Sequence, residues 1–228
     1  MPIRLRPTAP MAPNAILVGD PGRALLLAQE LLEKPKMSNH ARGLWGYTGR
    51  TPAGDGLTIQ ATGIGGPSAA IVLTDLAELG ARQVVRVGTC TAFGAEAQPG
   101  ELLLIEAARA TAGSAASFGF AADDTVSPDK PLSERLGVEL ETEAREAIVA
   151  SHDTLPVDAA RAGGAAAADM QTLAVFARAK ALEIAAAAIL VVAEAEGHEL
   201  LDDEQLGLTA VRAGKAAARA LSNPQVEG

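Results

Sequence analysis

Short apolar runs alternate with segments of helical spacing along the first third of the chain. Residues 15–18 form an apolar run that breaks at Gly, Asp and Pro, and residues 24–32 then carry helical spacing. Residues 42–50 alternate small and bulky side chains, and residues 57–62 form a second strand-like run after a turn at 51–56. The pattern predicts a strand, a helix and a two-stranded hairpin.

A glycine-rich turn at residues 63–68 separates the end of this hairpin from a predicted helix over 68–79. The apolar run at 84–87 follows as the next strand. The order strand, glycine loop, helix, strand predicts a βαβ unit with parallel strands. Because ligands bind beyond the carboxyl ends of such strands, the glycine loop and a turn at 88–90 are expected to share one crevice.

The second half of the chain has a less regular pattern. We predict a strand at 101–106, a loop at 107–120, a helix at 132–148 capped by Ser133, a helix at 173–182 capped by Asp169, a buried strand at 184–193 and an amphipathic helix at 201–221. Residues 159–168 fit a helix start or a pliable loop. Glu194 follows a strand, where catalytic groups tend to lie, although a solvated acid fits this position equally.

Arg86 is the anomaly of the hydrophobic pattern, because it stands inside the strand-like run at 84–87. A guanidinium that is buried in a sheet needs an anionic partner to offset the loss of its hydration. The residues that follow it are Val, Gly, Thr and Cys. We therefore expect a carboxylate or a bound anion near Arg86.

The composition is consistent with one α/β domain that spans residues 1–228. Hydrophobic residues make up 48% of the chain but aromatic residues only 3%, so Ala, Val, Leu and Ile must build the core. The net charge of -9 disfavours nucleic acid or an anionic membrane as partner. No signal-type segment follows the N-terminus, and the longest apolar run is too short to span a bilayer. The expected location is the cytoplasm.

Cysteine and histidine are too sparse for several kinds of site. Cys90 is the one cysteine, which excludes an intrachain disulfide and a multi-Cys metal site, and it is best interpreted as a small buried residue. The histidines at 40, 152 and 198 lack metal-ligand spacing, so no metal is assigned.

Several motifs occur in an order and at a spacing that are more specific than any one of them. They are Leu-Val-Gly-Asp-Pro-Gly-Arg at 17–23, Arg-Gly-Leu-Trp-Gly-Tyr-Thr-Gly at 42–49, Thr-Gly-Ile-Gly-Gly-Pro-Ser at 62–68, Arg-Val-Gly-Thr-Cys at 86–90 and Val-Val-Ala-Glu at 191–194. With these motifs the chain resembles the nucleoside phosphorylases of the hexameric bacterial type, which include purine nucleoside and uridine phosphorylases. The resemblance implies an α/β fold with a mixed, twisted, partly barrel-like sheet flanked by helices.

The resemblance also implies phosphorolysis, in which inorganic phosphate attacks the anomeric carbon of a nucleoside and releases the base. Phosphate is then a co-substrate, and no other cofactor is expected. Gly19, Arg23, Arg86 and Thr89 match the phosphate site of the family. Arg42 matches an arginine that a neighbouring subunit donates, which implies a homo-oligomer, a dimer or a hexamer. Arginine suits this task because its fork makes paired, charge-assisted bonds to phosphate oxygens.

The nucleoside side of the pattern departs from the family. The nucleoside residues implied by the match are Cys90, Thr91, Asp169, Met170 and Gln171. Gln171 replaces a glutamate that clamps the ribose hydroxyls, which is expected to weaken ribose binding by about 1 to 2 kcal/mol or to change the preferred sugar. Thr91 stands where the family usually has glycine. The aromatic residues expected near residues 151–155 are missing.

Three functions fit these residues. Glu194 aligns with the aspartate that protonates the base in the purine enzymes, so that Glu194 and Arg86 are the expected catalytic residues of a purine nucleoside phosphorylase. Uridine phosphorylases use a Gln and Arg pair ahead of the Met motif, whereas here Arg161 stands there without a glutamine. The third alternative is a non-catalytic member that keeps the phosphate pocket.

Overall fold

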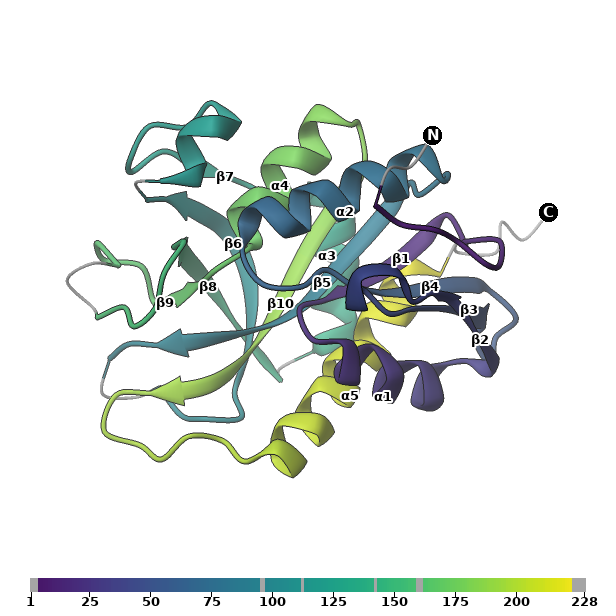
Figure 1. Ribbon diagram of the computed structural model, residues 1–228. Helices are drawn as coiled ribbons and strands as arrows, with labels where there is room; N and C mark the ends of the chain where they lie inside the picture. The colour runs from purple at the N-terminus through teal and green to yellow at the C-terminus, as the bar shows by residue number, and fades with distance from the viewer. Residues whose placement is uncertain (1–3, 95–96, 112, 142, 159–161, 223–228) are drawn as a thin grey trace.

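The strands form one sheet that is rolled up on one side and open on the other (Figure 1). A computed structural model describes residues 4–94, 97–111, 113–141, 143–158 and 162–222. The strands are β1 (Asn14–Val18), β2 (Glu33–Asn39), β3 (Gly46–Arg50), β4 (Gly56–Ala61), β5 (Gln83–Ala92), β6 (Leu102–Ala110), β7 (Thr125–Val126), β8 (Ala144–Ser151), β9 (Ala167–Asp169) and β10 (Ala185–Ala195).

The strand order explains the partly closed shape. Within the described residues the sheet has 10 strands in the order β10-β6-β8-β9-β5-β1-β4-β3-β2, β7 pairs with β6, and β10 also pairs with β5. The second pairing of β10 closes a ring through β5, β10, β6, β8 and β9. β1 lies between β4 and β5 and is parallel to both, as the predicted βαβ unit requires. β10 is parallel to β5, so the two strands end at the same edge.

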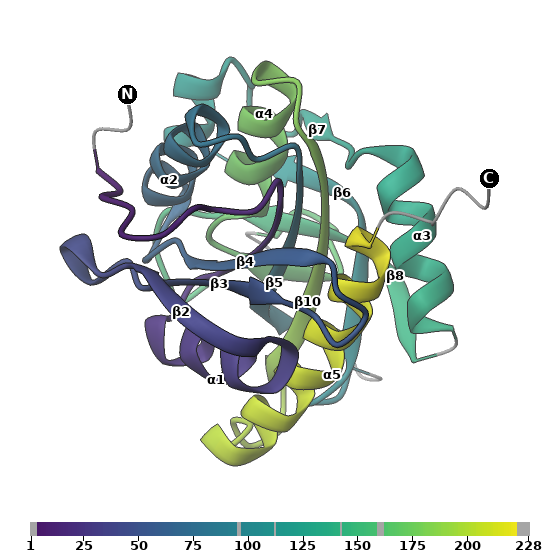
Figure 2. The same ribbon diagram turned by 90° about the vertical axis from the view of Figure 1, so that its right-hand side faces the viewer.

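Helices cover both faces of the sheet. They are α1 (Pro21–Leu31), α2 (Gly66–Glu78), α3 (Lys130–Leu140), α4 (Thr172–Ala181) and α5 (Asp203–Leu221). Leu73 of α2 and Phe176 of α4 pack in one core cluster. Leu27 of α1, Leu136 of α3 and Ala213 of α5 pack in the other. Figure 2 shows α2 and α4 on one side of the sheet and α1 and α5 on the opposite side. The predicted α/β class, with a mixed, partly barrel-like sheet in a single domain, is confirmed.

The predicted helix at 132–148 is wrong in its second half and in its cap. Helix α3 starts earlier, because the Asp129 carboxylate, not the Ser133 side chain, accepts the Leu132 amide at 2.9 Å. It ends at Leu140, after which Glu141 has a positive φ of 50°. The residues from 144 to 151 form β8, which is parallel to β6 and β9. Long-range pairing with two strands here overrides local helical spacing.

Two element boundaries and one whole strand also differ from the sequence prediction. The predicted turn at 88–90 lies inside β5, which continues to Ala92 because β10 and β9 pair with its second half. The predicted loop at 107–120 begins as part of β6 and ends with a short helix at Ser114–Phe118. Strand β2 was not predicted, because its exposed, charged sequence carries no apolar alternation. No helix of the described residues is long and apolar enough to cross a membrane.

Candidate functional site

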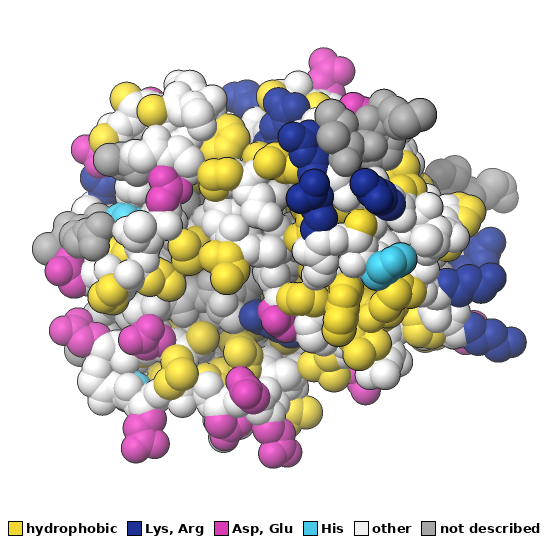
Figure 3. Space-filling model, in the orientation of Figure 1, with side chains coloured by type: hydrophobic (Ala, Val, Ile, Leu, Met, Phe, Trp, Pro, Cys, Tyr) yellow, Lys and Arg dark blue, Asp and Glu magenta, His cyan; other side chains and the backbone are white. Residues whose placement is uncertain are grey.

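A cavity of about 490 Å³ lies where β1, β4, β5 and β10 end. Because parallel strands bring their carboxyl ends to one edge, residues that are far apart in the sequence meet here. Of the residues predicted from the sequence, the cavity is lined by Gly19, Arg23, Arg86, Thr89, Cys90, Thr91, Asp169, Met170, Gln171 and Glu194. Figure 3 shows one face of the molecule, with Lys and Arg gathered toward the upper right and Asp and Glu mostly along the left and lower edges.

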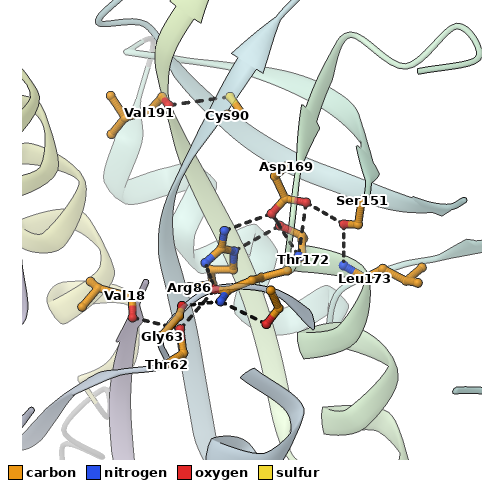
Figure 4. Close-up of polar contacts among 12 residues, drawn as sticks. Val18, Thr62, Gly63, Arg86, Cys90, Ser151, Asp169, Thr172, Leu173 and Val191 are labelled. Carbon is orange, nitrogen blue, oxygen red and sulfur yellow. Dashed lines mark hydrogen bonds and ion pairs between the residues drawn. The ribbon is translucent and has the colours of Figure 1, made fainter. Parts of the chain in front are cut away.

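Arg86 is buried, and its charge is paired inside the protein (Figure 4). Its Nη2 donates to Oδ2 of Asp169 at 2.9 Å, its Nη1 donates to Oε1 of Gln171 at 2.8 Å, and its Nε donates to Oγ1 of Thr172 at 3.2 Å. The expected carboxylate partner is therefore Asp169. These bonds engage three of the five N–H groups of a guanidinium. One N–H on each terminal nitrogen is left without a hydrogen-bond acceptor among the described residues.

Asp169 is held as firmly as the arginine that it pairs with. Its Oδ1 accepts from the Ser151 hydroxyl at 2.5 Å, and its Oδ2 accepts from the hydroxyl and the amide of Thr172 at 2.6 and 3.0 Å. The predicted capping of α4 is thus made by the Asp169 carboxylate, although Gln171 occupies the N-cap position and makes no side-chain cap bond. One carboxylate consequently fixes both the start of α4 and the direction of Arg86.

Gly88 has no side chain, and the guanidinium of Arg86 occupies the space that a side chain would fill. A Cβ atom at this position would lie 2.6 Å from Cζ of Arg86 and 2.7 Å from Cδ2 of Leu190. Such distances are far below van der Waals contact, so that any side chain at position 88 would displace the arginine. The glycine of the Arg-Val-Gly-Thr-Cys motif is therefore a steric requirement of the Arg86 conformation.

Arg23 approaches the same cavity from the first turn of α1. Burial lowers the pKa of its guanidinium, the Asp20 carboxylate opposes this shift, and the like charge of Arg86 adds to it. The Asp20 side chain caps α1 by accepting the Arg23 amide at 2.8 Å. Two cations thus face one cavity beside a helix N-terminus, an arrangement that favours a bound anion.

Thr91 and Glu194 are direct partners at the mouth of the cavity. They lie opposite each other in the pairing of β5 with β10, where the register shifts between Val192 and Glu194. The Thr91 hydroxyl donates to Oε2 of Glu194 at 3.1 Å. The hydroxyl at position 91 therefore orients the carboxyl group that the sequence predicted to act on the base.

Cys90 contributes a buried thiol to the cavity wall. Its Sγ donates to the carbonyl oxygen of Val191 at 3.6 Å. Burial raises the pKa of the thiol well above its usual range, and the Asp169 carboxylate adds to the shift. The thiol is therefore protonated at neutral pH and is a poor nucleophile.

Arg42 is the one predicted site residue that the cavity does not include. It lies in the short helix Ala41–Gly43 with a positive φ of 60°. Together with Arg4 and Leu44 it lines an adjoining groove of about 840 Å³. Residues 63–65 form the wall between the groove and the cavity, because they line both. Within one chain, Arg42 is thus separated from Arg23 and Arg86 by the glycine loop.

Sequence reasoning missed several residues of the site. Leu155 and Leu200 line the cavity, and both are mostly exposed. Thr62 and Thr172 contact Gln171 and Arg86. Lone threonines and leucines in loops carry no recognisable motif, although Thr172 stands three residues after Asp169, the spacing of a helix cap. Arg161 lies outside the described residues. Among the residues that the structure describes, no group of three or more His, Cys, Asp and Glu is arranged to hold a metal ion.

Comparison with known proteins identifies the family to which the chain is similar. The family model described as "Phosphorylase superfamily" matches residues 13–223. A "Purine nucleoside phosphorylase DeoD-type" of Oceanobacillus iheyensis is 37% identical over 99 residues, which are 43% of this chain and 42% of the relative. The protein of the same name from Alkaliphilus metalliredigens is 37% identical over 95 residues, 41% of this chain and 40% of the relative. Each of these alignments thus spans less than half of the length of the relative.

Proposed function

The chain belongs to the phosphorylase superfamily, and we propose that it is a nucleoside phosphorylase. In this reaction an oxygen of inorganic phosphate bonds to the anomeric carbon of the pentose, and the glycosidic C–N bond breaks. Its electron pair leaves with the base, which takes up a proton. The products are a pentose 1-phosphate and the free base. A purine nucleoside is the proposed substrate, because the similar proteins are named purine nucleoside phosphorylases and because Glu194 stands at the cavity mouth.

The observation that carries the proposal is the pair of arginines at one cavity. Arg23 and Arg86 line the same cavity, and Arg86 keeps one N–H on each terminal nitrogen for a further acceptor. Phosphate would accept these hydrogens together with those of the Thr89 hydroxyl and the Gly19 amide. A dianion held there is both the nucleophile and the counter-charge for a cationic sugar in the transition state.

The Asp169 carboxylate makes this use of Arg86 possible. It neutralises the buried guanidinium in the absence of phosphate, so that the site does not leave an unpaired buried charge. It also fixes the plane of the guanidinium, which directs the remaining N–H groups before phosphate binds. Preorganised donors of this kind lower the cost of charge stabilisation at the moment of reaction.

At the mouth of the cavity, Glu194 would supply the proton that the departing base needs. The hydrogen bond from Thr91 holds its carboxyl group in one orientation. Cys90 and Met170 offer apolar surface next to Thr91, against which a base can lie. These residues form the proposed nucleoside half of the site.

We also propose that the protein forms a homo-oligomer. Arg42 lies in the groove on the far side of the glycine loop, which supports a role for it in the cavity of a neighbouring copy rather than in its own. The small partners proposed are a nucleoside and phosphate, with no metal, organic cofactor, nucleic acid or membrane. The cytoplasmic location expected from the sequence is part of the same proposal.

A nucleoside panel tests the proposed reaction. The protein is incubated with purine and pyrimidine nucleosides, each with and without inorganic phosphate, and free base is measured by chromatography. We expect base release from a purine nucleoside only when phosphate is present. Release without phosphate would replace the proposal with a hydrolase, and phosphate-dependent release from uridine alone would replace the purine assignment. Absence of release from every nucleoside would favour a binding protein.

Substitution of Arg86 tests whether this arginine is needed for phosphate-dependent turnover. In Arg86→Lys, which keeps the charge but not the planar fork, turnover is expected to fall on the order of a hundredfold to a thousandfold. Arg86→Ala is expected to abolish phosphate-dependent turnover. Arg50→Ala is the matched control, because the Arg50 side chain is exposed and, within the described residues, donates to the nearby Gly54 carbonyl oxygen. Full activity in both Arg86 variants would show that the arginine is only structural.

A further inference from the structure

Every hydrogen-bonding group of the Gln171 side chain is engaged inside the protein. Its Oε1 accepts from Nη1 of Arg86 at 2.8 Å and lies 3.1 Å from the Thr62 hydroxyl, whose one hydrogen is shared with the Val18 carbonyl oxygen at 3.0 Å. Its Nε2 donates to the carbonyl oxygens of Gly63 at 2.6 Å and of Gly65 at 3.2 Å. The residue is 3% exposed. One amide thus connects the start of α4, strand β5 and the glycine loop.

The chemistry of these neighbours determines which way the amide points. Arg86 presents a hydrogen and cannot accept one, so the Gln171 atom that faces it must be an acceptor. Gly63 and Gly65 present carbonyl oxygens, so the atom that faces them must be a donor. A glutamate at position 171 could satisfy the arginine but would place a negative oxygen against two carbonyl oxygens. Only an amide of this length meets both requirements.

We propose that Gln171 is a positioning residue that latches residues 63–65, the part of the glycine loop that precedes α2, to Arg86. The latch reaches the first turn of the site as well. A Cβ atom on Gly19 would lie 3.6 Å from the Gly63 carbonyl oxygen and 3.9 Å from Oε1 of Gln171, so Gly19 lies beside the latch with no side chain between them. The latch therefore sets the spacing among the Gly19 turn, the glycine loop and Arg86.

The latch changes what Gln171 contributes to substrate binding. Both of its amide hydrogens are bonded to loop carbonyl oxygens, and its oxygen accepts from Arg86, so the amide has no free donor for a pentose hydroxyl. The resemblance had suggested a direct, weakened hold on the ribose diol. Under the latch, Gln171 acts through the loop and through Arg86, and it gives no preference between a pentose that carries the 2′-hydroxyl and one that lacks it.

Hydrogen exchange tests the latch without reference to catalysis. The amides of Thr62 and Ala69 bracket the loop and bond to the carbonyl oxygens of Val18 and Gly65. In Gln171→Glu and in Gln171→Met both loop bonds are lost, so exchange of these amides is expected to quicken on the order of 30-fold, as for the loss of two ordinary hydrogen bonds. Gln29→Glu on the exposed face of α1 is the matched control and is expected to leave the two rates unchanged. Unchanged rates in both Gln171 variants would overturn the latch.

Kinetics then test the consequence, which rests on the proposed function. For Gln171→Met we expect KM for phosphate to rise about tenfold or more, because the loop and Arg86 lose their common support. The ratio of kcat/KM for a nucleoside to that for its 2′-deoxy form is expected to stay within about twofold of the wild-type ratio. A large change in this ratio with an unchanged KM for phosphate would overturn the latch in favour of a direct sugar contact. If the wild-type protein has no phosphorylase activity, the proposed function fails, while the exchange rates still decide the latch.

Discussion

Removal of the Asp169 carboxylate is the sharpest test of the paired charges in the site. The side chains of Arg86 and Asp169 are 5% and 0% exposed, so Asp169→Ala leaves a guanidinium in the interior without its counter-charge. Breaking a buried pair in this way costs about 3 to 5 kcal/mol. The hydroxyls of Ser151 and Thr172 lose an acceptor as well, each at a cost of about 1 kcal/mol or more. Partial relaxation and entry of water offset some of this, so we expect a loss of about 4 kcal/mol of unfolding free energy.

Urea unfolding of matched variants measures this loss. Asp169→Asn keeps the volume but must place an NH2 group against donors, and we expect it to cost about 2 kcal/mol. The double variant Asp169→Ala, Arg86→Met removes both charges. It is expected to be more stable than the sum of the single variants predicts by about 1.5 kcal/mol or more, since the orphaned charge is gone. Glu143→Ala breaks the exposed pair with Arg212 and is expected to change stability by less than about 0.5 kcal/mol.

Two results would refute this reasoning. A loss below about 1 kcal/mol for Asp169→Ala would mean that water or another group compensates Arg86 as well as the carboxylate does. Additivity of the two single changes would mean that the ion pair in the structure carries no energetic coupling. In either case the carboxylate could not be the group that preorganises Arg86 for phosphate.

Two further predictions concern the neighbours of Arg86. Gly88→Ala is expected to destabilise the fold by about 1 to 3 kcal/mol in urea unfolding and to reduce turnover, because the new methyl group displaces the guanidinium. Gly56→Ala is the control and is expected to change neither quantity, because its methyl group would meet Ala12 at an ordinary contact distance of 3.5 Å. Equal behaviour of the two variants would contradict the steric argument. Because burial raises the pKa of the Cys90 thiol, the folded state binds its proton more tightly than the unfolded state, so the contribution of Cys90 to stability is full at low pH and declines as the pH rises above about 8.5. Iodoacetamide at pH 8 is therefore expected to label folded protein at least about tenfold more slowly than urea-unfolded protein, and equal labelling rates would contradict the burial of this thiol.

The local patterns predicted the elements that bring most of the site together. The apolar run before Gly19, the glycine loop and the strand that contains Arg86 are bounded by turn formers, so their positions follow from short stretches of sequence. The end of β10 near Glu194 was predicted for the same reason. Ten of the predicted site residues line one cavity because these elements are parallel neighbours.

The predicted helix at 132–148 was wrong because α3 and β8, which it joined, both have apolar residues at helical spacing. Residues 130–148 carry apolar positions that suit a helix throughout, yet the positive φ at Glu141 separates α3 from β8. Whether residues 144–151 form a helix or a strand is decided by β6 and β9, which offer hydrogen bonds on both edges. Local spacing contains no information about those partners.

For Arg86, the sequence alone determined that a buried guanidinium must be neutralised. It could not say by which group, since the chain has 28 acidic residues. The fold selects Asp169, which is 83 residues away, and brings it to 2.9 Å because β9 and the start of α4 lie beside β5. The fold likewise turns Gln171 toward the glycine loop. Residue types determine which interactions are needed, whereas only the tertiary structure decides which distant groups are close enough to make them.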